Sequence, residues 1–252
     1  MAEERILSSV LILGATSGIA RAVAAEFARH KYDLILAGRD RPELDATAAD
    51  LAIRFDVRTH VCVFDVLALD THSTVLSSCF SEAGNDLAGA VLAIGYLGDE
   101  SLAENDLAEA RRILDTNLTG CVSVLNILAR HFESRGSGFI CALSSVAGDR
   151  GRQSNYHYGA AKAGLSVYLQ GLRNQLYHRG VQVTTVKPGF VDTGMTFGRP
   201  GLFLVASPDY VARRIFQAIR SRRDVVYIPW FWRVIMWAIR NIPEWLFKRL
   251  RL

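Results

Sequence analysis

The stretch that decides the fold is residues 8–20, which read SSVLILGATSGIA. An aliphatic run with the length of a buried strand passes directly into a glycine turn and then into a helical pattern. The spacing GxxxGxA gathers backbone N–H groups and the positive end of the helix around one point, where a pyrophosphate would bind. We expect the turn to hold it through Gly14, Thr16, Ser17, Gly18 and Ile19.

The rest of the chain repeats this alternation of strand and helix. Aliphatic or β-branched runs predict seven strands at residues 8–13, 34–37, 60–64, 90–94, 139–143, 182–186 and 225–228. Strands that alternate with helices form a parallel sheet covered on both faces. The predicted fold class is therefore α/β, a Rossmann-type doubly wound seven-stranded parallel sheet in a single domain. One helix should run through Asn117 toward Arg130, and residues 188–207 should form a lid or binding loop.

Residues 37–41, AGRDR, follow the second predicted strand and bear on the choice of dinucleotide. An acidic residue at this strand end would bind the ribose hydroxyls of NAD. Here Gly38 leaves room, and the Arg39 guanidinium can pair with a 2′-phosphate. NADP(H) is therefore favoured, while Asp40 keeps NAD(H) open as the alternative.

Two further strand ends are expected to contact the same cofactor. Asp65 and Val66 end the third strand, where the carboxylate either accepts a hydrogen bond from the adenine amino group or serves only as a turn residue. Ala93 ends the fourth strand, and its small side chain lets the backbone approach the cofactor. After the sixth strand, backbone groups at Pro188, Gly189 and Val191 could hold a nicotinamide carboxamide, with the Thr193 hydroxyl at the pyrophosphate. An ordinary Pro-Gly turn is the alternative.

Tyr158 and Lys162 lie one helical turn apart on one face of a predicted helix. A nearby ammonium, helped by an oxidised nicotinamide, should lower the pKa of the phenol from its usual value near 10, so that Tyr158 can give or take a proton. Ser145 follows the fifth strand and would hold a substrate carbonyl oxygen. Asn117 would position a water that relays protons to Lys162. Tyr156, the competing tyrosine, lies nearly on the opposite face of that helix.

Composition bounds the organisation of the chain. Its 252 residues, 50% of them hydrophobic, suit one core, which we divide into a dinucleotide-binding and catalytic domain, residues 1–228, and an amphipathic tail, residues 229–252. The 4 cysteines form no CxxC pair and no Cys/His cluster, so neither a disulfide nor a metal site is expected. No secretory signal is recognisable at the start, and we expect a cytoplasmic protein. The 29 basic residues are scattered without a zinc-finger or RNA-motif signature, so no nucleic-acid partner is expected.

The tail contains all 4 tryptophans of the chain, Trp230, Trp232, Trp237 and Trp245, interleaved with basic residues. Its longest uninterrupted apolar run, residues 234–239, is too short to span a bilayer. Two interpretations stay open. The tail either lies in a membrane interface, which would make the protein peripheral on the membrane, or packs over the substrate loop or a partner subunit of a homo-oligomer.

Taken together, these motifs resemble those of the short-chain dehydrogenase/reductase family over nearly the whole chain. The resemblance implies hydride transfer from C4 of a nicotinamide, with Ser145 orienting the carbonyl, Tyr158 protonating it, Lys162 holding the ribose and tuning Tyr158, and Asn117 completing a tetrad. Two departures are Ala20 in place of a glycine and Ala93-Ile94-Gly95 where the family often has Asn-Ala-Gly. Residues 97–99, 144–165 and 231–250 resemble the branch that contains decaprenylphosphoryl-2-keto-ribose reductase, which implies a keto group on a lipid-linked sugar.

The function predicted is therefore the transfer of a hydride from NAD(P)H to a ketone or keto-sugar carbonyl on a small-molecule or lipid-linked substrate. NAD-dependent oxidation of an alcohol is the alternative within the same chemistry. A non-catalytic nucleotide-binding regulatory protein is the alternative from another class, although such a protein need not retain Ser145, Tyr158 and Lys162 together. A sugar epimerase is disfavoured because the chain ends soon after the seventh strand, without a substantial substrate domain.

Overall fold

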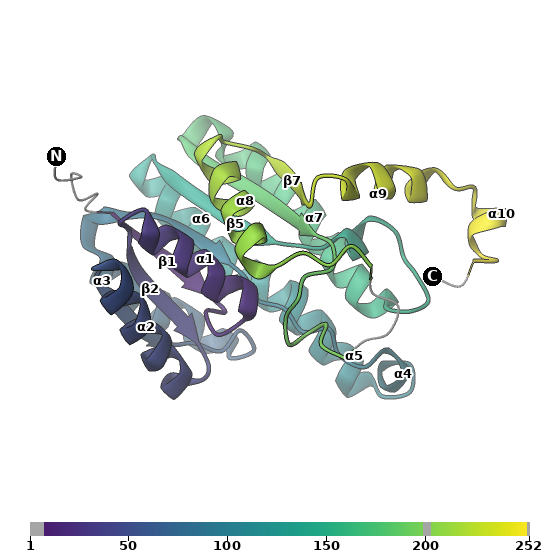
Figure 1. The fold of residues 1–252 in the computed structure, drawn as a ribbon, viewed down its shortest axis with the longest axis horizontal. Helices are drawn as coiled ribbons and strands as arrows, with labels where there is room; N and C mark the ends of the chain where they lie inside the picture. Colours follow the sequence, from purple (N-terminus) through teal and green to yellow (C-terminus); the bar gives the residue numbers. More distant parts are fainter. Residues whose placement is uncertain (1–7, 199–202, 251–252) are drawn as a thin grey trace.

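Seven parallel strands form the central sheet of the protein, in the order β3-β2-β1-β4-β5-β6-β7 (Figure 1). The computed structural model describes residues 8–198 and 203–250. The strands are β1 (Ser9–Leu13), β2 (Asp33–Gly38), β3 (Thr59–Val63), β4 (Leu87–Leu92), β5 (Gly138–Leu143), β6 (Val181–Pro188) and β7 (Val225–Ile228). The order reverses between β1 and β4, which is where open α/β sheets bind ligands.

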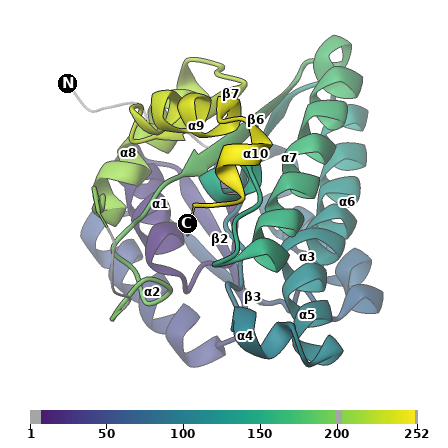
Figure 2. The ribbon, with the colours of Figure 1, turned by 90° about the vertical axis from the view of Figure 1, so that its right-hand side faces the viewer.

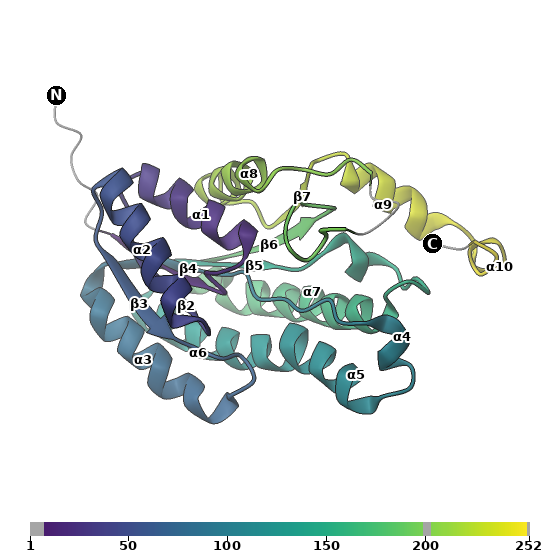
Figure 3. The same ribbon diagram turned by 60° about the horizontal axis from the view of Figure 1, so that its bottom comes forward.

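Helices cover both faces of the sheet, as Figure 3 shows. One face carries α1 (Gly18–Arg29), α2 (Arg41–Phe55) and α8 (Pro208–Arg220), and the other carries α3 (His72–Ala83), α6 (Gly120–Arg135) and α7 (Tyr156–Leu176). Along β1, Val10 and Ile12 pack into the first layer, whereas Leu11 and Leu13 pack into the second. The shorter helices are α4 (Glu100–Ala103), α5 (Leu107–Leu114), α9 (Trp232–Asn241) and α10 (Glu244–Phe247). The 3-10 turns are Leu69–Thr71, Gly84–Asp86, Val146–Asp149 and Tyr177–Arg179.

The predicted seven-stranded doubly wound sheet is confirmed, and the main error in its strands concerns β4. That strand was expected at residues 90–94 but runs over Leu87–Leu92. Its first residues pair with the start of β1, with Leu87 opposite Ser9 and Gly89 opposite Val10. Ala88 and Gly89 interrupt the apolar pattern, so this part of the strand depends on pairing with β1 rather than on local composition.

The helix expected to run unbroken through Asn117 is interrupted. Between α5 and α6, residues Asp115–Thr119 form a π-helical turn, in which the amide of Gly120 donates to the carbonyl of Asp115. Such turns insert one extra residue and are frequent at functional sites. The expected buried face is nevertheless continuous, because Ile113, Asn117 and Cys121 are all 0% exposed.

The connection from β6 to α8 is anchored at both ends. Val191 and Ala206 form an isolated parallel bridge, and the amide of Ala206 donates to the carbonyl of Phe190 at 2.9 Å. Residues 199–202 of the expected lid lie outside the described residues, as do residues 1–7 and 251–252. Among the described residues, no helix has both the length and the apolar character needed to cross a membrane.

Candidate active site

The site lies at the carboxyl edge of the sheet, where the strand ends face the viewer in Figure 2. In a parallel sheet every carboxyl end reaches the same edge. The residues predicted for the site follow these ends directly: Gly14 after β1, Arg39 after β2, Ala93 after β4 and Gly189 after β6. The topology therefore brings together segments that are far apart in the sequence.

The turn between β1 and α1 has the features expected of a phosphate-binding loop. Gly14 has φ +80°, and a Cβ there would lie 2.8 Å from the carbonyl oxygen of Ala93, so the close approach of the two strand ends requires glycine. Ser17 caps α1 by accepting a hydrogen bond from the amide of Ala20 at 3.3 Å. Within the described chain, the amides of Gly18 and Ile19 have no acceptor and point out of the helix start.

A pocket of about 210 Å³ opens beside this turn and collects seven of the predicted dinucleotide ligands. The predicted residues that line it are Gly14, Thr16, Ser17, Arg39, Asp65, Val66 and Ala93. Residues that the sequence analysis missed also line it, among them Phe64, Ile94, Tyr96, Arg112 and Thr116. The Arg112 guanidinium carbon lies 4.4 Å from the centre of the Tyr96 ring, which adds a second positive charge to the pocket.

Arg39 and Asp40 take different roles at the end of β2. Arg39 is exposed and lines the pocket. Asp40 instead caps α2, because its carboxylate accepts a hydrogen bond from the amide of Glu43 at 3.0 Å. The carboxylate that favoured NAD in the sequence is therefore already engaged by a helix N-terminus.

Asp65 shows the turn role that the sequence left open. Its Oδ1 accepts a hydrogen bond from the amide of Leu67 at 3.0 Å, while the residue still lines the pocket. Its contact with an adenine remains a prediction. Val66 approaches the start of α6 so closely that a Cβ on Gly120 would lie 2.4 Å from its carbonyl oxygen.

Tyr158 is the buried tyrosine of α7, with 8% of its surface exposed. Burial raises the pKa of the phenol to about 12, and a hydrogen bond with the Ser145 side chain partly offsets this rise. The protein's own groups therefore do not produce the lowered pKa that the sequence predicted, since Lys162 is not among the charges that shift it. Tyr158 and Ser145 nevertheless lie together, as their assigned roles require.

Lys162 is 2% exposed and lies between the ends of two strands. Its Nζ donates to the carbonyls of Ile94 at 3.2 Å and Leu143 at 3.1 Å, and lies 5.7 Å from the centre of the Tyr158 ring. An ammonium has three donors, so one remains for a ligand. Burial lowers the pKa of Lys162 from its usual value.

Asn117 uses its side chain to hold the chain after β4. Its Oδ1 accepts from the amide of Tyr96 at 3.2 Å, and its Nδ2 donates to the carbonyls of Tyr96 at 2.6 Å and Ile113 at 2.8 Å. A Cβ on Gly95 would lie 3.4 Å from this Oδ1 and 3.6 Å from Nζ of Lys162, so Asn117 and Lys162 flank one backbone position. The side chain amide is thus committed to structure, and the proton relay remains a prediction.

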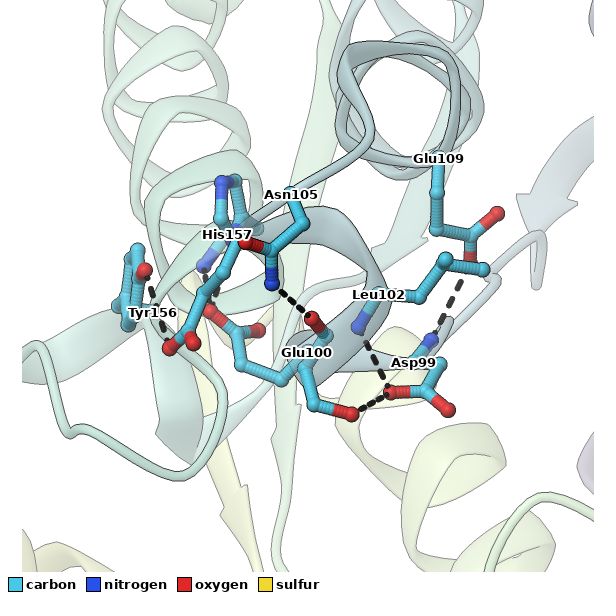
Figure 4. A network of polar contacts seen from close by, with 9 residues as sticks. Asp99, Glu100, Leu102, Asn105, Glu109, Tyr156 and His157 are labelled. Atoms are coloured by element: carbon cyan, nitrogen blue, oxygen red, sulfur yellow. Dashed lines mark hydrogen bonds and ion pairs between the residues drawn. The ribbon is translucent and has the colours of Figure 1, made fainter.

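Figure 4 shows how α4 braces the start of α7, immediately before Tyr158. Glu100 Oε1 contacts the Nδ1 of His157 at 2.8 Å and accepts from its backbone amide at 3.2 Å. The hydroxyl of Tyr156 donates to Glu104 at 3.3 Å, and this tyrosine is 41% exposed. Tyr156 is therefore directed toward α4, whereas Tyr158 is directed toward Ser145.

The predicted ligands that follow β6 do not line the pocket, but one of them reaches the phosphate loop. A Cβ on Gly18 would lie 3.1 Å from Cγ2 of Thr193, so Thr193 packs beside the start of α1. Val191 is buried, and Gly189 lies against the Trp232 ring, where a Cβ would lie 1.9 Å from Nε1. The contacts assigned to Pro188, Gly189 and Val191 remain predictions.

A buried polar cluster that no sequence pattern indicated links the turn that follows β5 to the ends of β6 and β7. Lys187, at the end of β6, forms an ion pair with Asp149, and the hydroxyl of Tyr227 on β7 donates to Asp149 at 2.7 Å. The Asp149 side chain is only 2% exposed. This cluster ties the turn after Ser145 to the strand that leads into residues 188–193.

The residues present fit a nicotinamide dinucleotide. The unpaired amides at the start of α1 and the close approach at Gly14 suit a pyrophosphate. The positive side chains of the pocket suit further phosphate. Ser145, Tyr158 and Lys162 lie next to this cradle and could act on a carbonyl group held beside it.

Comparison with known proteins agrees with this geometry. A sequence model described as short chain dehydrogenase matches residues 8–199. An uncharacterized oxidoreductase of Mycobacterium tuberculosis is 36% identical over 241 residues, which cover 96% of each chain. Sulfoacetaldehyde reductase 2 of Chromohalobacter salexigens is 36% identical over 196 residues, 76% of each chain.

Among solved structures, a short-chain dehydrogenase from Sphingobium yanoikuyae in complex with NADPH superposes with a TM-score of 0.79. It is 25% identical, and the match covers 94% of this chain and 97% of that one. The predicted fold is thus found again in a protein that binds NADPH.

Proposed function

The chain belongs to the short chain dehydrogenase family and is an oxidoreductase of that family, and from this premise we propose that it reduces a ketone or keto-sugar carbonyl with NADPH. The observation that carries the proposal is the buried Tyr158, beside Ser145 and one helical turn from Lys162, at the edge of a dinucleotide pocket. The same residues serve alcohol oxidation in the reverse direction.

Each residue has a role that its surroundings support. A bound nicotinamide supplies or accepts the hydride. Ser145 donates a hydrogen bond to the carbonyl oxygen, and Tyr158 transfers its phenolic proton to that oxygen as negative charge develops. The raised pKa of Tyr158, about 12, keeps the phenol protonated at neutral pH, which suits the reductive direction. Lys162 is fixed by the carbonyls of Ile94 and Leu143, and its remaining N–H would donate to the cofactor ribose.

Preference for NADP(H) is supported by two observations. Arg39 lines the pocket while the neighbouring Asp40 is engaged in capping α2. The solved relative from Sphingobium yanoikuyae holds NADPH. NAD(H) is the alternative cofactor, and competitive binding of the two decides between them.

The substrate is proposed to be a lipid-linked keto-sugar, in keeping with the resemblance of residues 97–99, 144–165 and 231–250 to the branch that contains decaprenylphosphoryl-2-keto-ribose reductase. Exposed apolar side chains after β6, including Phe197 at 86% and Phe203 at 52%, support an apolar part of the substrate. We place the protein in the cytoplasm as a homo-oligomer. Turnover of polar, steroid-like and lipid-linked ketones, with sulfoacetaldehyde as a small aldehyde, measures this preference, and equal rates on all of them contradict it.

Replacement of the phenol tests the catalytic proposal. We expect Tyr158→Phe to bind cofactor normally but to lose turnover by at least about 100-fold, because the proton donor is removed. Tyr156→Phe is the matched control, since Tyr156 lies on the same helix and its hydroxyl contacts only Glu104 among the described residues. Near-normal turnover by Tyr158→Phe excludes the proposed role, and absence of cofactor-dependent turnover in the unaltered enzyme favours a regulatory nucleotide-binding protein.

A further inference from the structure

Helix α9 packs on the domain with one face and leaves the other face in solvent. On the packed side, Trp232 and Met236 are 2% and 1% exposed and join Val146 in one apolar cluster. On the outer side, Trp230 in the preceding turn is 67% exposed, and Val234 and Trp237 are 58% and 69% exposed. Val234 and Trp237 are three residues apart and share a face of α9, and Trp230 lines the same groove as both, so these three side chains form one apolar stripe.

The stripe borders an open groove of about 1500 Å³ between α8, the edge strand β7 and α9. Arginines dominate the charged residues that line this groove: Arg214, Arg222, Arg223, Arg233 and Arg240. Asp224 is the acidic residue on the lining, and its Oδ1 lies 3.7 Å from Nε of Arg173, so that its charge is partly balanced. The stripe therefore lies in a strongly positive environment.

We propose that the α9 surface, defined as Trp230, Arg233, Val234, Trp237 and Arg240, docks the protein on an anionic lipid bilayer. Indole rings prefer the headgroup level, and arginines beside them can contact lipid phosphates. Because Trp232 and Met236 already fix the helix to the domain, docking requires no folding of the tail. Figure 1 shows α9 and α10 beyond the carboxyl ends of the strands, and Trp230, Val234 and Trp237 are each more than half exposed there.

Charge disfavours a second copy of this chain as the occupant. A two-fold contact would bring the same patch of both copies together, and the arginines of one groove would face those of the other. A nucleic acid would neutralise the arginines, but sites for single strands present aromatic faces on which bases stack. Trp230 and Trp237 offer such faces, but the aliphatic Val234 that lies between them in the sequence does not, and its exposed side chain gains nothing from a base. An anionic bilayer matches both the charge and the apolar side chains.

Sedimentation of the full-length protein with vesicles tests the proposal. We expect it to bind vesicles of phosphatidylcholine with phosphatidylglycerol, to bind phosphatidylcholine alone weakly, and to be released from the anionic vesicles by high salt. Arg233→Glu/Arg240→Glu should lower the partition onto anionic vesicles by about tenfold or more. Trp230→Ala/Trp237→Ala should lower it in both lipids, and both variants should keep the melting temperature because the replaced side chains are exposed.

Matched controls lie outside the groove and outside the α9 surface. Tyr177→Ala removes an aromatic side chain that is 74% exposed, and Arg130→Glu reverses an exposed charge on α6. Both should bind vesicles as the unaltered protein does. The proposal is overturned if the full-length protein stays in the supernatant, or if the controls lose binding equally. It is also overturned if an oligonucleotide competes for the same residues, or if light scattering finds an oligomer that protects Trp237 from quenching by iodide.

Discussion

Arg39 is the residue on which the cofactor preference depends. It lines the pocket and has no ion-pair partner among the described residues, so it is available for a 2′-phosphate. We predict that Arg39→Ala weakens NADPH binding by about 1–3 kcal/mol and leaves NADH binding nearly unchanged, since a charge-assisted contact is lost. Calorimetric titration with each cofactor measures the difference.

Arg41→Ala supplies the control for that measurement. Its Nε lies 2.8 Å from Asp45 on the exposed side of α2, so this arginine is already paired. We expect both cofactors to bind Arg41→Ala as they bind the unaltered protein. Equal weakening of NADPH and NADH by Arg39→Ala contradicts the assignment, as does an unaltered enzyme that prefers NADH.

The raised pKa of Tyr158 predicts a loss of stability at high pH. The folded state holds the phenolic proton up to a pKa of about 12, whereas the ordinary value is 10.0, so the unfolded chain binds fewer protons between these values. The retained phenolic proton contributes about 2–3 kcal/mol to the free energy of unfolding. This contribution is fully present below pH 10 and is lost as the pH rises toward 12. Tyr158→Phe has no phenol and cannot lose this contribution. The free energies of unfolding of the unaltered protein and of Tyr158→Phe, measured with urea, should therefore diverge between pH 10 and pH 12. Parallel curves contradict the prediction.

The sequence predicted which site residues lie together only where those residues share one helix or directly follow a recognisable strand. Tyr158 and Lys162 share a helix face, and Ser145 follows a recognisable strand, so spacing alone predicted their convergence. Asp149 contacts Lys187 and Tyr227, which lie 38 and 78 residues further along the chain, on β6 and β7. No local pattern encodes such a pairing, because it depends on the order of β5, β6 and β7 in the sheet.

At the scale of elements, Arg150 holds the tail on the domain. Its guanidinium donates to the carbonyls of Ile239 at 2.7 Å and Ile242 at 2.6 Å, which belong to the end of α9 and the residue after it. It also lies 3.7 Å from the centre of the Phe247 ring. A cation at a helix C-terminus satisfies carbonyls that lack intrahelical partners. The turn that follows Ser145 is thereby joined to the tail.

We predict that Arg150→Ala releases α9 and α10 without unfolding the sheet. A hydrogen bond to a charged group contributes about 1.5–3 kcal/mol, so amide exchange in residues 232–250 should accelerate by at least about tenfold. Glu244→Gln is the control, because the Glu244 side chain is 78% exposed and its ion pair with Arg150 should contribute little. Unchanged exchange in Arg150→Ala shows that the aromatic contacts alone hold the tail.

The π-helical turn at Asn117 illustrates what periodicity can and cannot predict. The apolar spacing through Ile113, Asn117 and Cys121 correctly identified one buried face. It could not reveal the inserted residue, because positions four apart share a face of an unbroken α-helix as well, nor could it reveal the contact of Asn117 with Tyr96. The asparagine itself, a weak helix former in a buried position, was the local signal of that contact.

In the whole molecule, the tail packs some of its apolar side chains against the domain and exposes others to solvent. The sequence left membrane contact and packing as alternatives, because composition does not show which tryptophans face inward. The structure separates them: Trp232 contacts the rings of Phe190 and Phe203 at 5.5 Å and 5.6 Å, while Trp230, Trp237 and Trp245 are exposed. Packing of one face therefore does not compete with docking through the other.

Removal of the tail is consequently predicted to destabilise the domain. A form that ends at Ile228 loses Trp232 and Met236 and uncovers Val146 and Phe190. Burial of each large apolar side chain contributes about 1.5–3 kcal/mol, so the free energy of unfolding should fall by about 3–6 kcal/mol. A form that ends at Asn241 keeps α9 and should lose much less.

Chemical denaturation of both truncated forms, followed by circular dichroism, measures this difference. Turnover should fall in the shorter form as well, since the turn after Ser145 loses the Trp232 and Met236 contacts of Val146 and the Arg150 anchor. If the form ending at Ile228 is as stable and as active as the full chain, the tail is not part of the catalytic domain's core. The packed face of the tail would then add neither stability nor turnover to the domain, so only the exposed tryptophans would have a role.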